Sequence, residues 1–335
     1  MDTLSDVLRT LHLRGAIFLD ARFTAPWCAI SKTGHRDTGF FADNEHIVFF
    51  HILMQGSCKA RLLARSQTIE LRAGDLMLLA HDDGHIIGSD LERTPVDSDA
   101  LVVATSAGGL MQIDHGGGGE LTRFMCGYLA CDKRLCRALF DALPPLIQVS
   151  FGAGSAAPWL TEMLQLGMQE TSMPRPGSES VLAKLSELLF AEAVRRYAET
   201  VPAGDIGWLA GLRDRAVGKA LALMHARPGH PWSIDKLGTQ IGMSRSGLAQ
   251  RFNELVGQTP MQYLTRWRLT LAAQRLRLEP TSLRRIAEQV GYESEAAFNR
   301  AFKREFGVTP GRWRKQGRID STARDDSRES SLSRE

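Results

Sequence analysis

The sequence lacks any apolar run of the ~18 or more residues that a membrane-spanning helix needs. Its first six residues also lack the basic segment followed by an apolar segment that marks a secretory signal. We therefore expect no membrane helix and no secretory signal, and we predict a cytoplasmic protein.

Cysteines are few, and none is arranged as a pair. The five cysteines form an odd set without a Cys-x-x-Cys motif, which argues against a disulfide framework and against a zinc ribbon. A reducing cytoplasm is the simplest compartment for such a chain, and we expect no cofactor. The five are Cys28, Cys58, Cys126, Cys131 and Cys136.

Net charge is also small, at +3, but it is unevenly distributed. Residues 212–315 contain 19 Lys and Arg against 8 Asp and Glu, a net charge of +11, so the rest of the chain carries −8. A basic C-terminal module attached to an acidic remainder indicates a polyanionic partner, although a basic surface without a partner has the same composition.

The length of 335 residues suggests two or three domains. Short apolar runs separated by turn signals fill residues 12–130 and predict an all-β sandwich or barrel. From residue 156 the apolar residues recur at helical spacing, with a break at Ser172–Gly177, so two amphipathic helices are expected. Residues 318–335 have almost no apolar side chains and should be disordered. The predicted strands include His46–Met54, Ala60–Ala64, Thr68–Leu71, Leu76–Ala80 and Thr122–Leu129.

The basic module contains an internal repeat. Ser233–Leu237 matches Ser282–Ile286 at an offset of 49, and the Gly-x-Thr-Pro segment ending at Pro260 matches the one ending at Pro310 at an offset of 50. The second copy therefore has one extra residue, just after Gly291. Each copy is interpreted as a helix, a turn at glycine and a second helix, with serine caps at both helix starts.

Apolar residues four positions apart should anchor each second helix to the core. These pairs are Leu248 with Phe252 and Phe298 with Phe302. The segment Met261–Leu278 between the copies is predicted to be a helix that joins the two units rigidly through Trp267, Leu271 and Leu276.

The run from Gly291 to Arg304, followed by Gly307–Pro310, resembles the signature of AraC/XylS-type transcription regulators. The resemblance covers roughly residues 212–314 and rests on two copies at the family spacing with both Gly-x-Thr-Pro endings. It implies a sequence-specific DNA-binding regulator with recognition helices at about Arg245–Leu255 and Glu295–Phe306, and promoter DNA as its partner.

Helix geometry indicates which side chains contact DNA, because the apolar anchors face inward. Arg300 can pair with guanine, and Gln250 or Asn299 with adenine. Each of these positions is otherwise an ordinary solvated surface residue. The predicted contacts are Arg245, Ser246, Ala249, Gln250 and Asn253 in the first copy, and Glu295, Ala296, Asn299, Arg300 and Lys303 in the second.

Gly74-Asp75, an apolar strand and then His81 and His85 resemble the second half of a cupin barrel. Segments Ala25–Cys28, Phe50-His51, Gly207–Leu209 and Leu221–His225 are similar to the cupin-type sensor branch of the same family. The implied fold is an α+β chain with an N-terminal cupin-like β-barrel and an all-α C-terminal domain with two helix-turn-helix units.

A metal site is the main alternative for the cupin region. The first cupin motif lacks its His-x-His pair. His51 and His85 are therefore the metal candidates, and they could converge with Glu45 or His81 inside the barrel. Buried histidines in a degenerate barrel are the simpler interpretation. A metal-dependent cupin enzyme fused to a DNA-binding module remains the alternative function. We predict no catalytic residues, and so no enzyme.

Four segments follow. We predict a cupin-like sensor domain at 1–150, a helical linker and candidate dimerisation segment at 151–205, the double helix-turn-helix domain at 212–316 and a disordered tail at 317–335. The resemblance also implies a small-molecule effector or a redox effector sensed by Cys28 or Cys126, and we expect an activator role with RNA polymerase as a further partner. The helices at 156–198 either pack on the barrel or form the interface of a homodimer, which is the commonest symmetric assembly.

Overall fold

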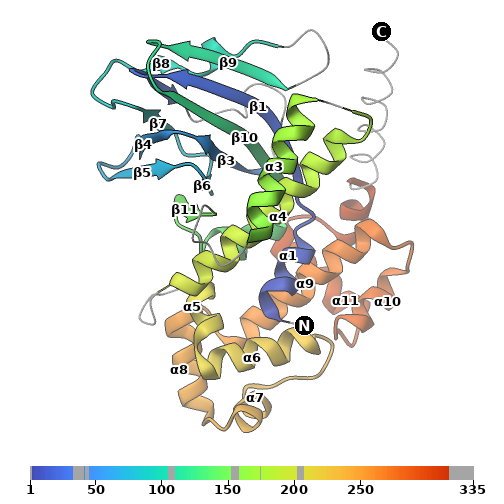
Figure 1. Cartoon of the computed structure of the whole chain (residues 1–335). Helices are drawn as coiled ribbons and strands as arrows, with labels where there is room; N and C mark the ends of the chain where they lie inside the picture. Colours follow the sequence, from blue (N-terminus) through green and yellow to red (C-terminus); the bar gives the residue numbers. More distant parts are fainter. Residues whose placement is uncertain are drawn as a thin grey trace. The chain divides into compact units, whose positions relative to one another are not determined.

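The computed structural model describes residues 2–32, 41, 45–104, 110–151, 158–173, 175–201 and 207–316. The predicted disordered tail lies outside these residues. The chain divides into two compact units, which are described separately (Figure 1). The sheet unit comprises Leu11–Thr200, and the helical unit comprises Met1–Thr10 together with Val201–Glu335. None of the described helices is long and apolar enough to span a membrane.

The sheet unit contains two β-sheets. The larger sheet has six strands in the order β11-β6-β3-β10-β1-β9. Their bounds are β1 Arg14–Thr24, β3 Glu45–Gln55, β6 Asp75–Leu79, β9 Met111–Gly116, β10 Leu121–Asp132 and β11 Leu146–Ser150. The predicted strands at 46–54 and 122–129 are confirmed as parts of β3 and β10, and the run at 76–80 falls largely within β6.

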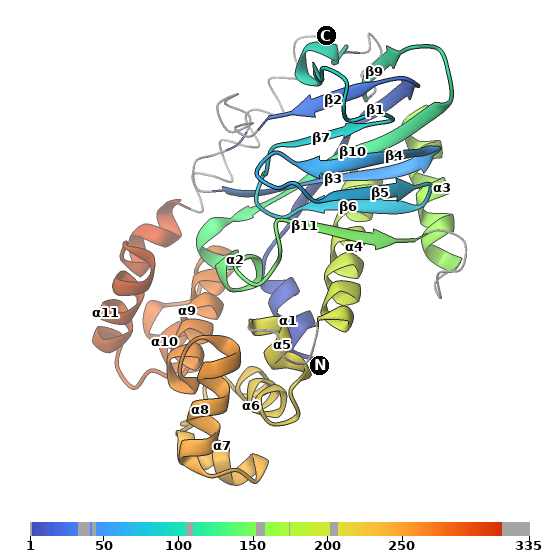
Figure 2. The same cartoon turned by 90° about the vertical axis from the view of Figure 1, so that its left-hand side faces the viewer.

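The smaller sheet has five strands in the order β5-β4-β7-β2-β8, and β2, β7, β4 and β5 are labelled in Figure 2. The predicted strand Thr68–Leu71 is confirmed within β5, and the predicted strand Ala60–Ala64 overlaps β4 but begins three residues and ends two residues after it. The bounds are β2 Cys28–Ser31, β4 Ser57–Leu62, β5 Thr68–Arg72, β7 His85–Gly88 and β8 Val96–Asp97.

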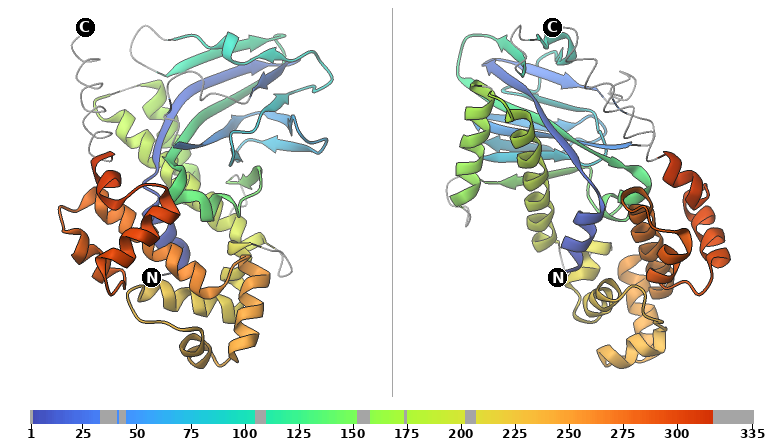
Figure 3. Two further views of the ribbon diagram at one scale, coloured as in Figure 1. Left: turned by 180° about the vertical axis from the view of Figure 1, so that it is seen from behind. Right: turned by 90° about the vertical axis from the view of Figure 1, so that its right-hand side faces the viewer.

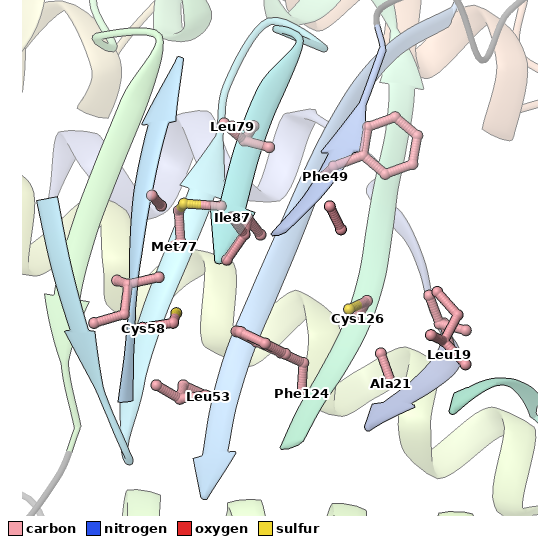
Figure 4. Packing of buried hydrophobic residues seen from close by; sticks show 14 of the residues in the cluster. Leu19, Ala21, Phe49, Leu53, Cys58, Met77, Leu79, Ile87, Phe124 and Cys126 are labelled. Carbon is pink, nitrogen blue, oxygen red and sulfur yellow. The ribbon is translucent and has the colours of Figure 1, made fainter. Parts of the chain in front are cut away.

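Side chains from both sheets form one apolar core (Figure 4). Alternation along the strands directs Leu19 and Ala21 of β1, Phe124 and Cys126 of β10, and Leu53 of β3 into it. The predicted cupin-like, sheet-rich N-terminal region is confirmed, although its two sheets are not closed into one barrel. Among the described strands, no hydrogen-bonded pairing joins the edge of one sheet to the other, so the two sheets remain separate.

Two helices cover the six-stranded sheet. They are the two helices expected from the sequence after residue 156. These are α3 (Pro158–Ser172) and α4 (Ser178–Thr200), and α4 packs along β1 (Figure 3). Gly15 permits this approach, because a Cβ there would lie 2.7 Å from Cβ of Ser186. A short helix, α2 (Lys133–Phe140), follows β10.

The helical unit begins with an element that is remote in sequence. Helix α1 (Thr3–Thr10) packs against α6 and α9 and buries Thr3, Val7 and Thr10. The chain returns to this unit after residue 200. The remaining helices are α5 (Trp208–Arg213), α6 (Arg215–Ala226), α7 (Ile234–Ile241), α8 (Arg245–Val256), α9 (Pro260–Leu278), α10 (Leu283–Gln289), α11 (Glu295–Phe306) and a helical segment at 310–316.

Candidate nucleic-acid interface

The first repeat folds into helix, turn and helix, as predicted. The Ser233 hydroxyl accepts the backbone N–H of Lys236 at 3.2 Å and begins α7. Gly242 ends α7 with φ +78°, a left-handed conformation that glycine adopts without a Cβ penalty. The Ser244 hydroxyl then accepts the N–H of Gly247 at 3.2 Å and begins α8.

The second repeat has the same serine caps and the same glycine turn. Ser282 caps α10, Gly291 has φ +87°, and Ser294 caps α11 by accepting the N–H of Ala297. The extra residue lies in the turn between Gly291 and Ser294. Within this longer turn the Tyr292 ring packs 5.5 Å from the Phe298 ring.

The predicted anchors of both recognition helices are confirmed. Leu248, Phe252, Phe298 and Phe302 are all 0% exposed. Because they occupy one side of α8 and α11, the opposite sides remain open to solvent.

The Gly-x-Thr-Pro segments both end one helix and begin the next. Gly257 and Gly307 close α8 and α11 with φ near +75°. Thr259 and Gln262 then form a capping box, with Pro260 in the first turn of α9.

None of the ten predicted DNA-contacting residues is buried. Eight are exposed and two, Ala249 and Asn299, are half-buried. The structure therefore groups five polar or small side chains on the outer face of α8 and five on that of α11. The exposed eight are Arg245, Ser246, Gln250, Asn253, Glu295, Ala296, Arg300 and Lys303.

Local interactions differ between the two outer faces. On α8, the Gln250 amide donates to Glu254 at 2.8 Å and Arg245 lies 3.5 Å from Asp235, so both side chains have partners to exchange on binding. On α11, Arg300 and Lys303 form no ion pair with the described residues. The second face therefore presents its positive charge more directly.

Helix α9 connects the two repeats as predicted. It has 19 residues, which at about 1.5 Å per residue span roughly 28 Å. Trp267 and Leu276 are buried, whereas Leu271 is half-buried.

A residue that the sequence analysis missed also holds the two repeats together. Arg268 of α9 donates to the carbonyl oxygens of Pro228 and His230 at 2.7 Å and of Gly291 at 3.4 Å. It thereby joins the loop before the first repeat to the turn of the second. Burial lowers the pKa of Arg268, yet a guanidinium keeps its charge in proteins. Because its partners are backbone atoms, no sequence motif marks this role.

The two metal candidates of the sheet unit face each other from different sheets. The His51 and His85 ring centroids are 5.0 Å apart, and Nδ1 of His51 lies 3.0 Å from Sγ of Cys126. Glu45 instead pairs with Arg14, and Nε2 of His81 lies 3.1 Å from the Leu143 carbonyl. Within the described ranges, no three His, Cys, Asp or Glu side chains lie close enough to hold a metal ion.

The five cysteines are free thiols and all are buried. Burial raises the pKa of Cys28 and raises that of Cys126 far above its ordinary value. Since the thiolate is the reactive form, both side chains are poor nucleophiles in this state. These two residues therefore give little support to a redox effector.

Two protein-family models match the chain, a cupin at residues 2–199 and a helix-turn-helix domain at residues 237–316. A putative AraC-like transcription regulator of Streptomyces antibioticus is 32% identical over 315 residues, which cover 94% of this chain and 99% of that protein. The chain belongs to the AraC-like transcription regulators.

Two further proteins are similar to parts or most of this chain. The RCS-specific HTH-type transcriptional activator RclR of Escherichia coli is 30% identical over 319 residues and covers 95% of this chain and 99% of the relative. A crystal structure of an AraC-type regulator from Chromobacterium violaceum is 29% identical, with a TM-score of 0.30, and covers 30% of this chain and 91% of that chain.

This AraC-like regulator is therefore a DNA-binding transcription regulator with an N-terminal cupin domain. The alternative of a metal-dependent enzyme is not favoured, because these relatives are regulators.

A buried polar network in the regulator's helical unit was also missed from sequence. The Tyr263 hydroxyl accepts the indole N–H of Trp208 at 2.9 Å and lies 2.7 Å from Nε2 of His225. The His225 ring stacks on Trp267 with centroids 4.0 Å apart, and its Nδ1 lies 3.7 Å from the Asp6 carboxylate of α1. The network thus joins α1, α5, α6 and α9.

We expect acid to weaken the helical unit through His225. Burial outweighs the nearby Asp6 carboxylate and lowers the pKa of His225 to about 3. The unfolded chain binds a proton near pH 6.5 and the folded chain only near pH 3, so stability is lost as pH falls between these values. Between pH 6.5 and 5 this loss should be about 1–2 kcal/mol, measured from urea midpoints of the full chain.

The matched control replaces a histidine that is less buried. His225→Gln keeps a polar group near Tyr263 and should flatten the pH dependence, whereas His230→Gln should leave it unchanged. An identical pH dependence in the parent chain and in His225→Gln would show that His225 does not titrate as described.

Proposed function

We propose that the regulator reads promoter DNA by inserting α8 and α11 into successive major-groove segments. The observation that carries this proposal is the repeated unit itself: two capped helices, each with one buried apolar side and one open polar side, joined by α9. The residues proposed to contact DNA are Arg245, Ser246, Ala249, Gln250, Asn253, Glu295, Ala296, Asn299, Arg300 and Lys303.

The proposed site is asymmetric. Major grooves recur on one DNA face every ~34 Å, and α9 spans roughly 28 Å, so modest DNA bending would align both helices. The two outer faces carry different side chains, and the turns before them differ by one residue. Each monomer should therefore protect two adjacent half-sites of unlike sequence, and a footprint confined to one groove segment would contradict this arrangement.

Replacing Arg300 or Gln250 with Ala should weaken cognate binding by about 1–3 kcal/mol each, because a bidentate base contact is lost. Preference should relax at one base pair for each variant, and the two base pairs should lie in different half-sites. Binding to a library of single-base operator variants measures both effects.

Lys303→Ala is the matched control on α11. If Lys303 contacts a phosphate, its loss should weaken binding to every library member alike. It should also reduce the slope of log affinity against log salt by about one. Arg284→Ala, which removes an exposed ion pair with Glu288 on α10, should change neither. Unaltered base preference in both the Arg300 and the Gln250 variants, with folding intact, would place the readout elsewhere.

We further propose that the sheet unit controls DNA binding in the cytoplasm in response to an effector, and that the protein activates transcription. The similar Escherichia coli protein RclR is a transcriptional activator, which supports this direction of control. Contacts with RNA polymerase and a homodimer through α3 and α4 belong to the same proposal. Transcription in a purified system, together with the mass of the chain in solution, tests these points.

A further inference from the structure

The sheet unit contains a cavity of about 400 Å³ between its two sheets. Small-molecule sites in proteins commonly have volumes of about 300–1,000 Å³. The strands that line it come from both sheets, so the cavity is part of the same interior as the apolar core in Figure 4. This volume admits a small molecule rather than a peptide segment.

Most of the described lining residues are apolar, and many of these are aromatic. Aromatic walls favour rings and hydrocarbon chains. The aromatic side chains are Phe18, Phe23, Trp27, Phe41, Phe49, Phe124 and Tyr128.

Charge in the lining disfavours an anion. Among the described residues that line the cavity, Asp82, Asp83 and Asp99 contribute carboxylates and Lys32 contributes the one Lys or Arg side chain. Lys32 is already paired, with its Nζ 2.7 Å from the Asp97 carboxylate, and its side chain is 64% exposed. An anionic ligand would therefore meet more carboxylates than cations among the described lining residues.

The indole N–H of Trp27, in the wall of the cavity, is a hydrogen-bond donor that a ligand could pair with. Trp27 is 2% exposed and stacks on Phe23 at 4.2 Å, yet its indole Nε1 has no hydrogen-bond partner among the described residues. A buried donor left in this state is costly, and a ligand acceptor would satisfy it. His51, His85 and Cys126 add a polar patch to the same lining.

We propose that this cavity binds an uncharged, largely apolar small molecule, and that the indole N–H of Trp27 donates to one acceptor atom of that molecule. This effector class rests on the proposed control of DNA binding by the sheet unit. Binding in the cavity is nevertheless measurable without DNA, so the two proposals can fail separately.

The first experiment compares two dyes that share one ring system. The neutral N-phenyl-naphthylamine should bind the full chain saturably, and anilinonaphthalene sulfonate, which adds a negative charge, should bind at least ~10-fold more weakly. Equal or tighter binding of the sulfonate would overturn the proposed charge preference. No saturable binding of either dye would overturn the site.

Two neighbouring valines locate the bound dye. Val102 lines the cavity, whereas Val103 is 64% exposed and is absent from the lining. Val102→Trp should weaken binding of the neutral dye by about 10-fold or more by filling the cavity, and Val103→Trp should leave it unchanged. If Val102→Trp melts early, Met111→Trp at the 37% exposed rim replaces it. A folded variant that fills the lining yet binds like the parent would contradict the proposed location.

A ketone probe tests the donor. Propionyl-dimethylamino-naphthalene should bind about 5–10-fold more weakly to Trp27→Phe, which keeps an aromatic ring against Phe23 but removes the N–H. The hydrocarbon-like N-phenyl-naphthylamine should bind both proteins alike. Equal ketone binding would remove Trp27 from the proposal.

Promoter binding is measured on the same samples. Retained DNA binding without dye binding would refute the effector class alone, and dye binding without DNA binding would refute the proposed DNA-reading function alone.

Discussion

DNA affinity of the helical unit is expected to fall about 1,000-fold or more as salt rises from ~50 to ~200 mM. Residues 212–315 carry a net charge of +11, and two recognition helices present their N-termini, with capping serines at 244 and 294, on the same unit. Neutralising roughly six or more phosphates releases the corresponding counterions, which produces this dependence.

Binding of a promoter fragment to the full chain and to residues 201–316 measures the effect. Both should show the same slope of log affinity against log salt, because the acidic remainder supplies no phosphate contacts. The fragment begins at 201 rather than 212 because a later start removes Trp208, which is buried and bonded to Tyr263. A slope near zero for a folded fragment would exclude DNA as its polyanionic partner.

Phe302→Ala is expected to destabilise the second repeat by about 3–5 kcal/mol. The Phe302 side chain is 0% exposed, and its ring lies 4.6–5.7 Å from those of Phe298, Phe306 and Trp313. Its loss leaves a cavity among three rings that cannot collapse easily, because α11 fixes Phe298 and Phe306 and the helical segment at 310–316 fixes Trp313.

The equivalent position in the first repeat is the matched variant. Phe252→Ala should cost a similar amount but should lower amide protection in α7 and α8, whereas Phe302→Ala should lower it in α10 and α11. Phe302→Leu should cost clearly less than Phe302→Ala. Hydrogen exchange resolves the two repeats, and loss of protection in the wrong repeat, or a cost below about 1 kcal/mol for Phe302→Ala, would contradict the assigned packing.

The repeats were predictable because their determinants are local. Serine caps, a glycine with positive φ and apolar pairs four residues apart all act within one or two helical turns. The predicted recognition helices differ from α8 by one residue and match α11. The open side of each helix followed from the same periodicity.

The sheet unit was less predictable. Alternation identified several strands, but the pairing of β1 with both β9 and β10 joins segments about 100 residues apart. Whether such strands close into a barrel depends on the edges of the sheets, which no single strand encodes.

The sequence by itself determined that this chain carries two helix-turn-helix units on a basic module, because periodicity, caps and charge are properties of neighbouring residues. Only the tertiary structure decided that α1 joins the helical unit, that Arg268 joins the two repeats through backbone carbonyls, and that residues from both sheets enclose an apolar cavity beside Trp27. These features depend on contacts between residues far apart in the chain, and the free energy of such contacts is decided by packing that no local pattern records.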